Sequence, residues 1–304
     1  MDDRKILIEK INNLKKAKKA IVLAHCYQNV EVDEVSDFVG DSLYLSREAA
    51  KTDAEIIVFA GVYFMAETAK ILSPSKKVLI PKKDAGCLMA DMIDLNKIKK
   101  FKSENPDVPV VCYVNSTAEV KSECDVCCTS ANAVNIVKSL KADKVLFVPD
   151  RNLGGFVASN VLEKEVICYD GCCPIHDCLT VEDIKAVKEQ NPKAKVLVHP
   201  ECIKDVASMA DYVGSTTGIM NYVKNSNDTE FIIVTEIGVV ERLERDYKDK
   251  KFIHISSKAV CENMKKITLE DIYNSLLEET YEVKVDENLI NEAYKPIEKM
   301  ISIG

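Results

Sequence analysis

Short apolar runs alternate with longer amphipathic stretches along most of the chain. The runs occupy residues 20–27, 55–62, 76–81, 108–114, 144–149, 165–169, 194–199, 230–235 and 251–256. Runs of this kind, rich in Val, Ile and Phe, predict buried β-strands, and the stretches between them predict covering helices. Continuously apolar strands that alternate with helices are typical of parallel sheets covered on both faces, so we expect an α/β fold.

The strand pattern repeats with a period of 86 to 88 residues. Matched positions include Asn105-Pro106 with Asn191-Pro192, His25 with Tyr113 and His199, Tyr27 with Asn115 and Glu201, Asp125 with Asp211, and Ser42 with Ser130 and Thr216. Self-similarity at a fixed spacing indicates repeated structural units. We therefore expect three homologous αβα three-layer units with parallel sheets, arranged around a pseudo-threefold axis.

Three of the 12 cysteines follow the same spacing. Cys87 and Cys173 are 86 residues apart, and Cys173 and Cys261 are 88 apart, so each ends its repeat just past the last strand. The spacing predicts a first unit of residues 1–86 with 266–304, a second of residues 87–172 and a third of residues 173–265. Equivalent points of the three units meet near the axis, so we expect these three cysteines to share one role.

Three thiolates at one point indicate an iron–sulfur site. A [4Fe–4S] cluster normally takes four cysteine ligands, so Cys87, Cys173 and Cys261 would leave one iron open to a substrate oxygen. Open coordination is the property of a catalytic metal site, whereas a structural site is closed. The plainer alternative is that these thiols, like most free cysteines, only pack in the core.

Polar triplets accompany the cysteines. The pairs His25 with Tyr27, Tyr113 with Asn115, and His199 with Glu201 follow the first strand of each repeat, where α/β sheets bind ligands. Ser42, Ser130 and Thr216 stand where later helices are expected to begin, and helix N-termini bind anions. Taken singly, each hydroxyl is more often a plain helix cap.

The other cysteines give weaker indications. Cys124, Cys127 and Cys128 fit one apolar face of a predicted helix, which favours packing over a zinc or redox site. Cys26 and Cys112 are expected to face the core, as is His254. Cys172 lies next to Cys173, so the choice of ligand between these two thiols stays open.

Composition limits the function further. The net charge is −8, which disfavours a nucleic-acid partner and requires local groups to hold any anionic substrate. No apolar run reaches the roughly 18 residues of a membrane span. Residues 1–20 read as a charged amphipathic helix without the apolar core of a signal peptide, so we expect a cytoplasmic protein.

The sequence resembles the quinolinate synthase family, the iron–sulfur enzymes of de novo NAD synthesis, over nearly its whole length. The resemblance lies in AHCYQ and GDSLYLS, YVNSTAEVKSECDVCCTSANA, PDRNLG, CPIH, HPEC, GSTTG, TEIG and CENMKKITLEDI. It implies a triplicated αβα fold and a [4Fe–4S] cluster with one substrate-accessible iron. It also implies condensation of iminoaspartate with dihydroxyacetone phosphate to quinolinate, phosphate and two waters.

The resemblance assigns roles to matching positions. It makes Cys87, Cys173 and Cys261 the cluster ligands, and its substrate set is His25, Tyr27, Ser42, Tyr113, Asn115, Ser130, His176, His199, Glu201, Ser215 and Thr216. Within that set we expect Glu201 to be the general base, with His199 beside it and Tyr27 as a proton relay. An aspartate oxidase or dehydrogenase would supply the iminoaspartate.

Two departures from the family pattern are Cys172 before the CPIH cysteine and Glu262 after Cys261; neither removes a ligand. A late Cys-x-x-Cys-x-x-Cys run is absent, so no C-terminal redox disulfide is expected. The rival readings are a triplicated reductase of isoprenoid diphosphate synthesis, an iron–sulfur sensor, and a metal-free α/β protein. HPEC and GSTTG argue against the first, and the polar triplets argue against the second.

Overall fold

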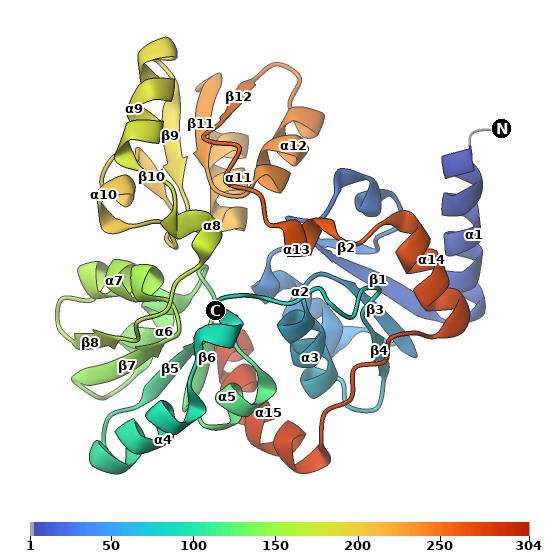
Figure 1. Ribbon diagram of the computed structural model, residues 1–304, viewed down its shortest axis with the longest axis horizontal. Helices are drawn as coiled ribbons and strands as arrows, with labels where there is room; N and C mark the ends of the chain where they lie inside the picture. Colours follow the sequence, from blue (N-terminus) through green and yellow to red (C-terminus); the bar gives the residue numbers. More distant parts are fainter. Residues whose placement is uncertain (1–2, 304) are drawn as a thin grey trace.

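The computed structural model describes residues 3–303 and contains three four-stranded parallel sheets. Strand order is the same in each, with the second strand of the unit at one edge, followed by the first, third and fourth: β2-β1-β3-β4, β6-β5-β7-β8 and β10-β9-β11-β12. Helices flank each sheet, and the three units lie around a common centre (Figure 1). The predicted fold of three αβα units with parallel sheets is confirmed.

The first sheet shows why its strands are apolar on both faces. It consists of β1 (Ala20–His25), β2 (Phe38–Gly40), β3 (Ile56–Ala60) and β4 (Lys77–Leu79), with helices α1 (Asp3–Ala17), α2 (Ser42–Lys51) and α3 (Tyr63–Leu72) and the 3-10 turns η1 (Val30–Glu34) and η2 (Ala90–Met92). Along β1, Val22 and Ala24 belong to one core with Ile11 of α1, whereas Leu23 belongs to another with Leu45 of α2. Alternate side chains point to opposite faces, so each face is buried under its own helices.

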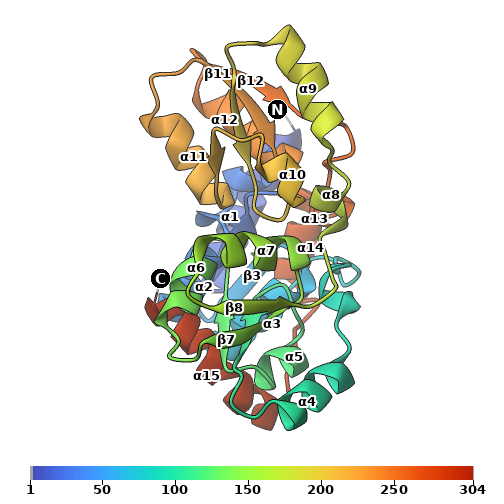
Figure 2. The same cartoon turned by 90° about the vertical axis from the view of Figure 1, so that its left-hand side faces the viewer.

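The second and third units repeat this plan. The second contains α4 (Leu95–Glu104), β5 (Val110–Tyr113), α5 (Ala118–Ser122), β6 (Val126–Cys128), α6 (Ala133–Ser139), β7 (Lys144–Val148), α7 (Arg151–Asn160) and β8 (Glu165–Cys168). The third contains α9 (Val181–Gln190), β9 (Lys195–Val198), α10 (Lys204–Ala207), β10 (Tyr212–Val213), α11 (Thr216–Asn225), β11 (Glu230–Val234), α12 (Ile237–Asp246) and β12 (Lys251–His254). Figure 2 shows the third unit above the second, joined through the short helix α8 (Pro174–Asp177).

Equivalent hydrogen bonds recur in all three units. An aspartate just before each edge strand accepts the first strand's backbone N–H: Val22 to Asp37 at 2.7 Å, Val110 to Asp125 at 2.8 Å and Val196 to Asp211 at 2.8 Å. These pairs obey the spacing found in the sequence. The repeat is therefore a repeat of local contacts as well as of strand order.

The predicted helix over Cys124, Cys127 and Cys128 is wrong. Residues Val126–Cys128 form the edge strand β6, and Cys112 of β5 lies in register with Cys127. The second strand of each unit (β2, β6 and β10) has only two or three residues and no long apolar run around it, so none of these three strands was predicted from the sequence. The burial expected for these cysteines is observed, as it is for Cys26 and Cys112.

The C-terminal segment returns to the first two units. Helix α14 (Leu269–Glu278) packs on α1 and β3, whereas α15 (Glu287–Ile303) packs chiefly on α5 and β6 and also on α3. The division of the chain at residues 87, 173 and 266 stays a prediction. Residues 1–2 of the expected N-terminal helix and residue 304 of the first predicted unit lie outside the described residues. No helix within residues 3–303 is long and apolar enough to cross a membrane.

Candidate active site

A cavity of about 480 Å³ lies where the three units meet. All but one of the site residues expected from the sequence line it: His25, Tyr27, Ser42, Cys87, Tyr113, Asn115, Ser130, Cys173, His176, His199, Glu201, Thr216 and Cys261. Ser215 lines the neighbouring cavity of about 880 Å³, which shares Asp41 and Ser130 with the first. The strand ends of three separate sheets thus contribute to one enclosed space.

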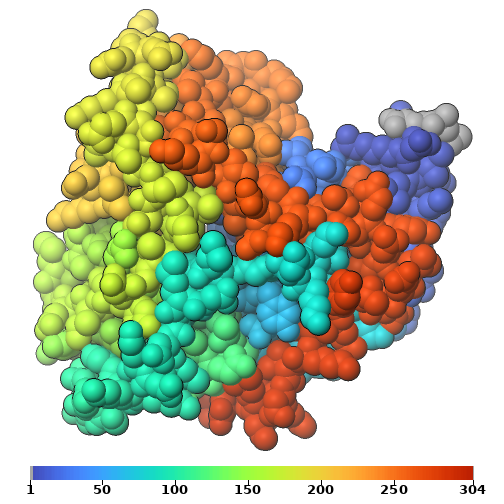
Figure 3. All heavy atoms as spheres, in the orientation of Figure 1, coloured from blue at the N-terminus to red at the C-terminus, as the bar shows by residue number. Residues whose placement is uncertain are grey.

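The three repeat cysteines reach this cavity through equivalent loops. Cys173 directly precedes α8, and Cys261 directly precedes α13 (Glu262–Lys265), while Cys87 follows β4. Figure 3 shows the segments that follow β4, β8 and β12 (teal, yellow-green and orange) meeting on one face. Cys172 does not line the cavity, which favours Cys173 as the inward-facing member of that pair.

The donor set fits an iron–sulfur cluster. Burial raises the pKa of Cys87 to about 12 and that of Cys261 to about 11, and each thiolate would repel the other. Burial likewise raises the pKa of Cys173, with Glu201 and Cys87 adding to the effect. A metal centre supplies the positive charge that makes such thiols ionise. Three thiols that converge on one cavity are therefore suited to hold a cationic group.

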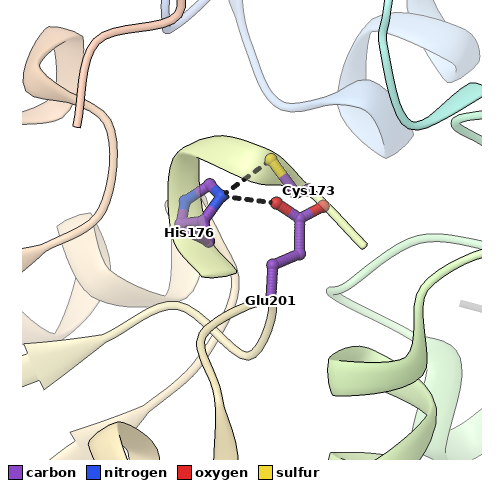
Figure 4. A group of neighbouring side chains, drawn as sticks. All are labelled: Cys173, His176 and Glu201. Atoms are coloured by element: carbon purple, nitrogen blue, oxygen red, sulfur yellow. Dashed lines mark hydrogen bonds and ion pairs between the residues drawn. The ribbon is translucent and has the colours of Figure 1, made fainter. Parts of the chain in front are cut away.

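His176, Glu201 and Cys173 form a compact group at the cavity wall (Figure 4). The Nδ1 atom of His176 lies 2.8 Å from Glu201 Oε2 and 3.2 Å from Cys173 Sγ. The potential ligand atoms of the three residues all lie within 4.8 Å of one another. The imidazole thus connects a proposed cluster ligand with a buried carboxylate.

Glu201 is buried yet favours its charged form. Burial alone would raise its pKa, but His176 and His199 outweigh that effect and lower it to about 2. Burial lowers the pKa of His199 to about 3, so its imidazole is neutral near pH 7. Nδ1 of His199 lies 3.6 Å from Glu201 Oε2. An ionised carboxylate at the cavity wall can accept a proton from a bound molecule.

Tyr27 reaches from the first unit into the third. Its hydroxyl lies 2.9 Å from Thr235 Oγ1 and accepts a hydrogen bond from Thr216 at 3.3 Å. Thr235 also lies 2.9 Å from Nε2 of His176. Thr235 belongs to the TEIG motif, and its sequence context predicts no role for it; in the structure it links the tyrosine to the histidine. A connected path of polar groups therefore runs from Tyr27 to Glu201.

The remaining expected residues complete the wall. Burial and the nearby Arg242 lower the pKa of His25 to about 3, and burial together with Glu201 raises that of Tyr113 well above its ordinary value. Asn115 Oδ1 is buried and lacks a hydrogen-bond partner among the described residues. A buried amide oxygen that lacks a partner is costly, so this atom is suited to bind a ligand donor.

The helix N-termini differ from the expectation in detail. Ser42 and Thr216 are the first residues of α2 and α11, while the capping side chains are those of Asp41 and Ser215. Asp41 accepts from Tyr44 N at 3.0 Å, and Ser215 accepts from Gly218 N at 3.1 Å. Ser130 precedes α6 by three residues. Because other groups cap α2 and α11, the hydroxyls of Ser42 and Thr216 are not needed as caps.

Two buried carboxyl groups next to the cysteine loops were not predicted from the sequence. Asp150 follows β7 and Glu236 follows β11, and both are fully buried. Burial, together with Glu201, raises the pKa of Asp150 to about 8, and burial raises that of Glu236 to about 7. The motifs PDRNLG and TEIG contain them, but their repeat-equivalent in the first unit is Val62, so no threefold pattern marked them. His254 lies half-buried at the end of β12, apart from the cavity lining.

Three parallel α/β units that enclose cysteines, histidines and a buried carboxylate are typical of an enzyme that acts on a small molecule at a cysteine-bound metal centre. A family model described as "Quinolinate synthetase A protein" matches residues 9–302. The chain therefore belongs to the quinolinate synthase family and is an enzyme of this kind.

Individual relatives match over nearly their full length. The chain is 52% identical over 297 residues to a quinolinate synthase of Alkaliphilus metalliredigens, an alignment that covers 98% of each chain. It is 51% identical over 303 residues to that of Clostridium kluyveri, covering 100% of both. It is 50% identical over 304 residues to quinolinate synthase 2 of Methanosarcina acetivorans, covering 100% of this chain and 97% of the relative. The resemblance found in the motifs is confirmed.

Proposed function

We propose that this enzyme condenses iminoaspartate with dihydroxyacetone phosphate to give quinolinate, inorganic phosphate and two waters. The observation that carries the proposal is the convergence of Cys87, Cys173 and Cys261 on the same cavity as the polar triplets. We assign these cysteines as ligands of a [4Fe–4S] cluster with one open iron. When bound, the cluster supplies a Lewis acid for substrate oxygen and for the departure of hydroxide.

The cavity offers groups for anion binding as well as groups for proton transfer. Ser42, Ser130 and Thr216 line it, at or near helix N-termini that favour anions. We assign them, with Ser215 in the adjoining cavity, to the substrate phosphate and carboxylates. His25, Tyr113 and Asn115 would orient the carbon skeleton, and the buried Oδ1 of Asn115 supports this role.

Glu201 is assigned as the general base. The ionised carboxylate can take a proton from carbon or nitrogen of the substrate, and His176 can hold it in position through the 2.8 Å contact. His199 stands beside it as a neutral imidazole able to donate or accept. Tyr27 can relay protons through Thr235 to His176, because each neighbouring pair of atoms lies 2.9 Å apart.

A second cofactor reading has its own support. Cys173, His176 and Glu201 could hold one transition-metal ion, as three protein ligands do in catalytic zinc sites. A single ion at these three residues would leave Cys87 and Cys261 without a role. It would also leave unexplained why the three cysteines follow the 86- to 88-residue repeat. Metal analysis separates the two, because the cluster predicts about four irons and four sulfides per chain.

The deciding assay is quinolinate formation under anaerobic conditions. The purified protein is supplied with aspartate, an imine-generating oxidase or dehydrogenase, and dihydroxyacetone phosphate. We expect a brown protein that forms quinolinate and releases one phosphate for each quinolinate, and a colourless, inactive Cys87→Ala variant. A brown protein that consumes neither substrate would contradict the proposed reaction while leaving the cluster intact. The source of iminoaspartate, an aspartate oxidase or dehydrogenase, belongs to the same proposal.

A further inference from the structure

Two of the three cysteine loops are fastened by buried carboxyl groups in the same way. Asp150 Oδ2 accepts the backbone N–H of Cys173 at 3.1 Å, and Glu236 Oε1 accepts that of Cys261 at 3.2 Å. The second oxygen of each carboxyl accepts an N–H of the adjacent helix: Leu153 N at 2.7 Å in α7, and Gly238 N at 2.7 Å in α12. Each carboxyl thus joins a helix N-terminus to a cysteine.

The carboxyl groups add to a docking contact that all three units share. In each unit, the helix that follows the third strand donates a hydrogen bond from the backbone N–H of its first residue. The acceptor is the backbone carbonyl two residues before the cysteine: Tyr63 donates to Ala85 at 2.8 Å, Arg151 to Gly171 at 2.8 Å, and Ile237 to Ala259 at 3.0 Å. This hydrogen bond fixes the position of the cysteine loop against the helix. In the second and third units the carboxyl then fixes the cysteine itself.

The backbone carbonyls of these cysteines are also engaged. Cys173 O accepts from His176 N at 3.1 Å, and Cys261 O accepts from Met264 N at 3.0 Å. With both backbone polar groups bonded, the direction of each Cα–Cβ bond is set before any metal arrives. Asp150 and Glu236 are fully buried, so water does not compete for these bonds.

The first unit lacks this arrangement. Val62 occupies the position equivalent to Asp150 and Glu236, and within residues 3–303 no carboxyl accepts the backbone N–H of Cys87. Two ligand positions are therefore preset, whereas the third is held by its loop contacts alone.

We propose that Asp150 and Glu236 are positioning residues that preset Cys173 and Cys261 to receive the metal cluster, an inference that rests on the proposed function. Groups that orient ligands from behind typically change metal affinity by about 10- to 100-fold when they are removed. The effect is expected on retention of the cluster first, and on turnover only through it.

Serine substitutions separate this role from helix capping. Asp150→Ser and Glu236→Ser retain a good cap for α7 and α12, but the shorter side chain no longer reaches the cysteine. Asp94→Ser is the matched control, because Asp94 caps α4 by accepting from Asn96 N at 2.9 Å and contacts no ligand cysteine. Glu67→Gln controls for the loss of a buried carboxyl group elsewhere.

The measurement is the rate at which a chelator removes iron from the anaerobic holoenzyme, together with iron per chain and the electron paramagnetic resonance spectrum of the reduced cluster. We expect Asp150→Ser and Glu236→Ser to release iron about 10- to 100-fold faster than the wild type, with broadened spectra, and both controls to match the wild type. If either serine variant fails to fold, Asp150→Asn and Glu236→Gln replace it, since an amide can accept only one of the two N–H bonds.

The outcomes distinguish this inference from the proposed function. A wild-type protein that binds no cluster overturns the metal centre itself. A wild-type cluster with unchanged iron release in every variant overturns the positioning role alone. Variants that keep the cluster and its spectrum but lose kcat would show an acid–base role for these carboxyl groups, which also overturns the inference.

Discussion

The imidazole of His176 lies 2.8 Å from the carboxylate of Glu201, although the two come from different elements, α8 and the turn after β9. Both side chains are almost completely buried. The pair fixes a charged carboxylate at the wall of the cavity, close to Cys173. The lowered pKa of Glu201 keeps this carboxylate ionised, which is why it is assigned the role of base.

Glu201→Gln tests that assignment. The amide keeps the shape of the side chain but cannot take up a proton, so kcat should fall by about 10²- to 10⁴-fold, the range for loss of a general base. Iron per chain should match the wild type, because Glu201 is not assigned as a cluster ligand. Anaerobic turnover and iron analysis on the same preparation measure both. A normal kcat would refute the role.

The adjacent pair Cys172 and Cys173 provides a matched test of the ligand set. Cys173 lines the cavity and is fastened by Asp150, whereas Cys172 does not line it. Cys173→Ala should therefore lose the cluster, and Cys172→Ala should retain it with wild-type iron and colour. If Cys172→Ala were the colourless variant, the ligand assignment would have to move by one residue.

Ser130→Ala tests anion binding. Ser130 lines both cavities. Loss of a hydrogen bond to a charged group costs about 1.5–3 kcal/mol, so KM for dihydroxyacetone phosphate should rise about 10- to 100-fold with little change in kcat. Ser139→Ala, at the other end of α6, is the control and should leave KM unchanged. A fall confined to kcat would assign Ser130 to the chemistry instead.

The buried carboxyl group of Glu67 should make the free energy of unfolding depend on pH. Burial raises its pKa above the ordinary 4.5, opposed by Lys121 and assisted by Glu119. The folded protein therefore holds this proton more tightly than the unfolded chain does. Its contribution to the free energy of unfolding must decrease as the pH rises from about 4.5 through the folded pKa.

Glu67→Gln should remove that decrease, since the amide does not titrate. Urea unfolding of the variant and the wild type between pH 4.5 and pH 8 should give a difference in stability that grows with pH in favour of the variant. A difference that stays constant across this range would mean that the carboxyl group titrates alike in both states.

Arg242 and Arg245 of α12 both pair with Asp33 of the first unit, but only Arg242 is buried. Arg242 also donates to the carbonyls of Cys26 at 2.8 Å and Gln28 at 3.0 Å, on either side of Tyr27. Arg242→Met should lower the free energy of unfolding by about 3–5 kcal/mol, because it leaves buried partners without a donor. The exposed counterpart Arg245→Met should cost about 1 kcal/mol or less. Equal losses in the two variants would contradict this reasoning.

The parts of the site that follow the repeat could be predicted from the sequence. His25, Tyr113 and His199 stand at the ends of equivalent strands. Because these strand ends occupy equivalent places in the three units, the positions of the side chains in space follow from their positions in the sequence. The same holds for the three cysteines. Their convergence on one cavity follows from symmetry before any contact is known.

The site residues that depart from the threefold repeat could not be predicted from the sequence. Thr235 has Pro149 and Gly61 as its repeat equivalents, and the equivalent of Asp150 and Glu236 is Val62. Their importance depends on contacts with residues far away in the sequence, which spacing alone does not reveal. The edge strand β10 was missed for a different reason: its two residues are too few for a period.

The packing of α14 on α1 has a consequence for how the protein is made. Ile272 and Leu276 belong to the same buried core as Ile11 and Val22, so one face of the first sheet is completed by residues near the end of the chain. Domains generally fold in the order in which they leave the ribosome, from the N-terminus. Here α1 covers this face of the first sheet only in part, so some of its apolar residues stay uncovered until α14 has been synthesised. A nascent chain stalled before residue 269 would expose those residues to other proteins in the cell.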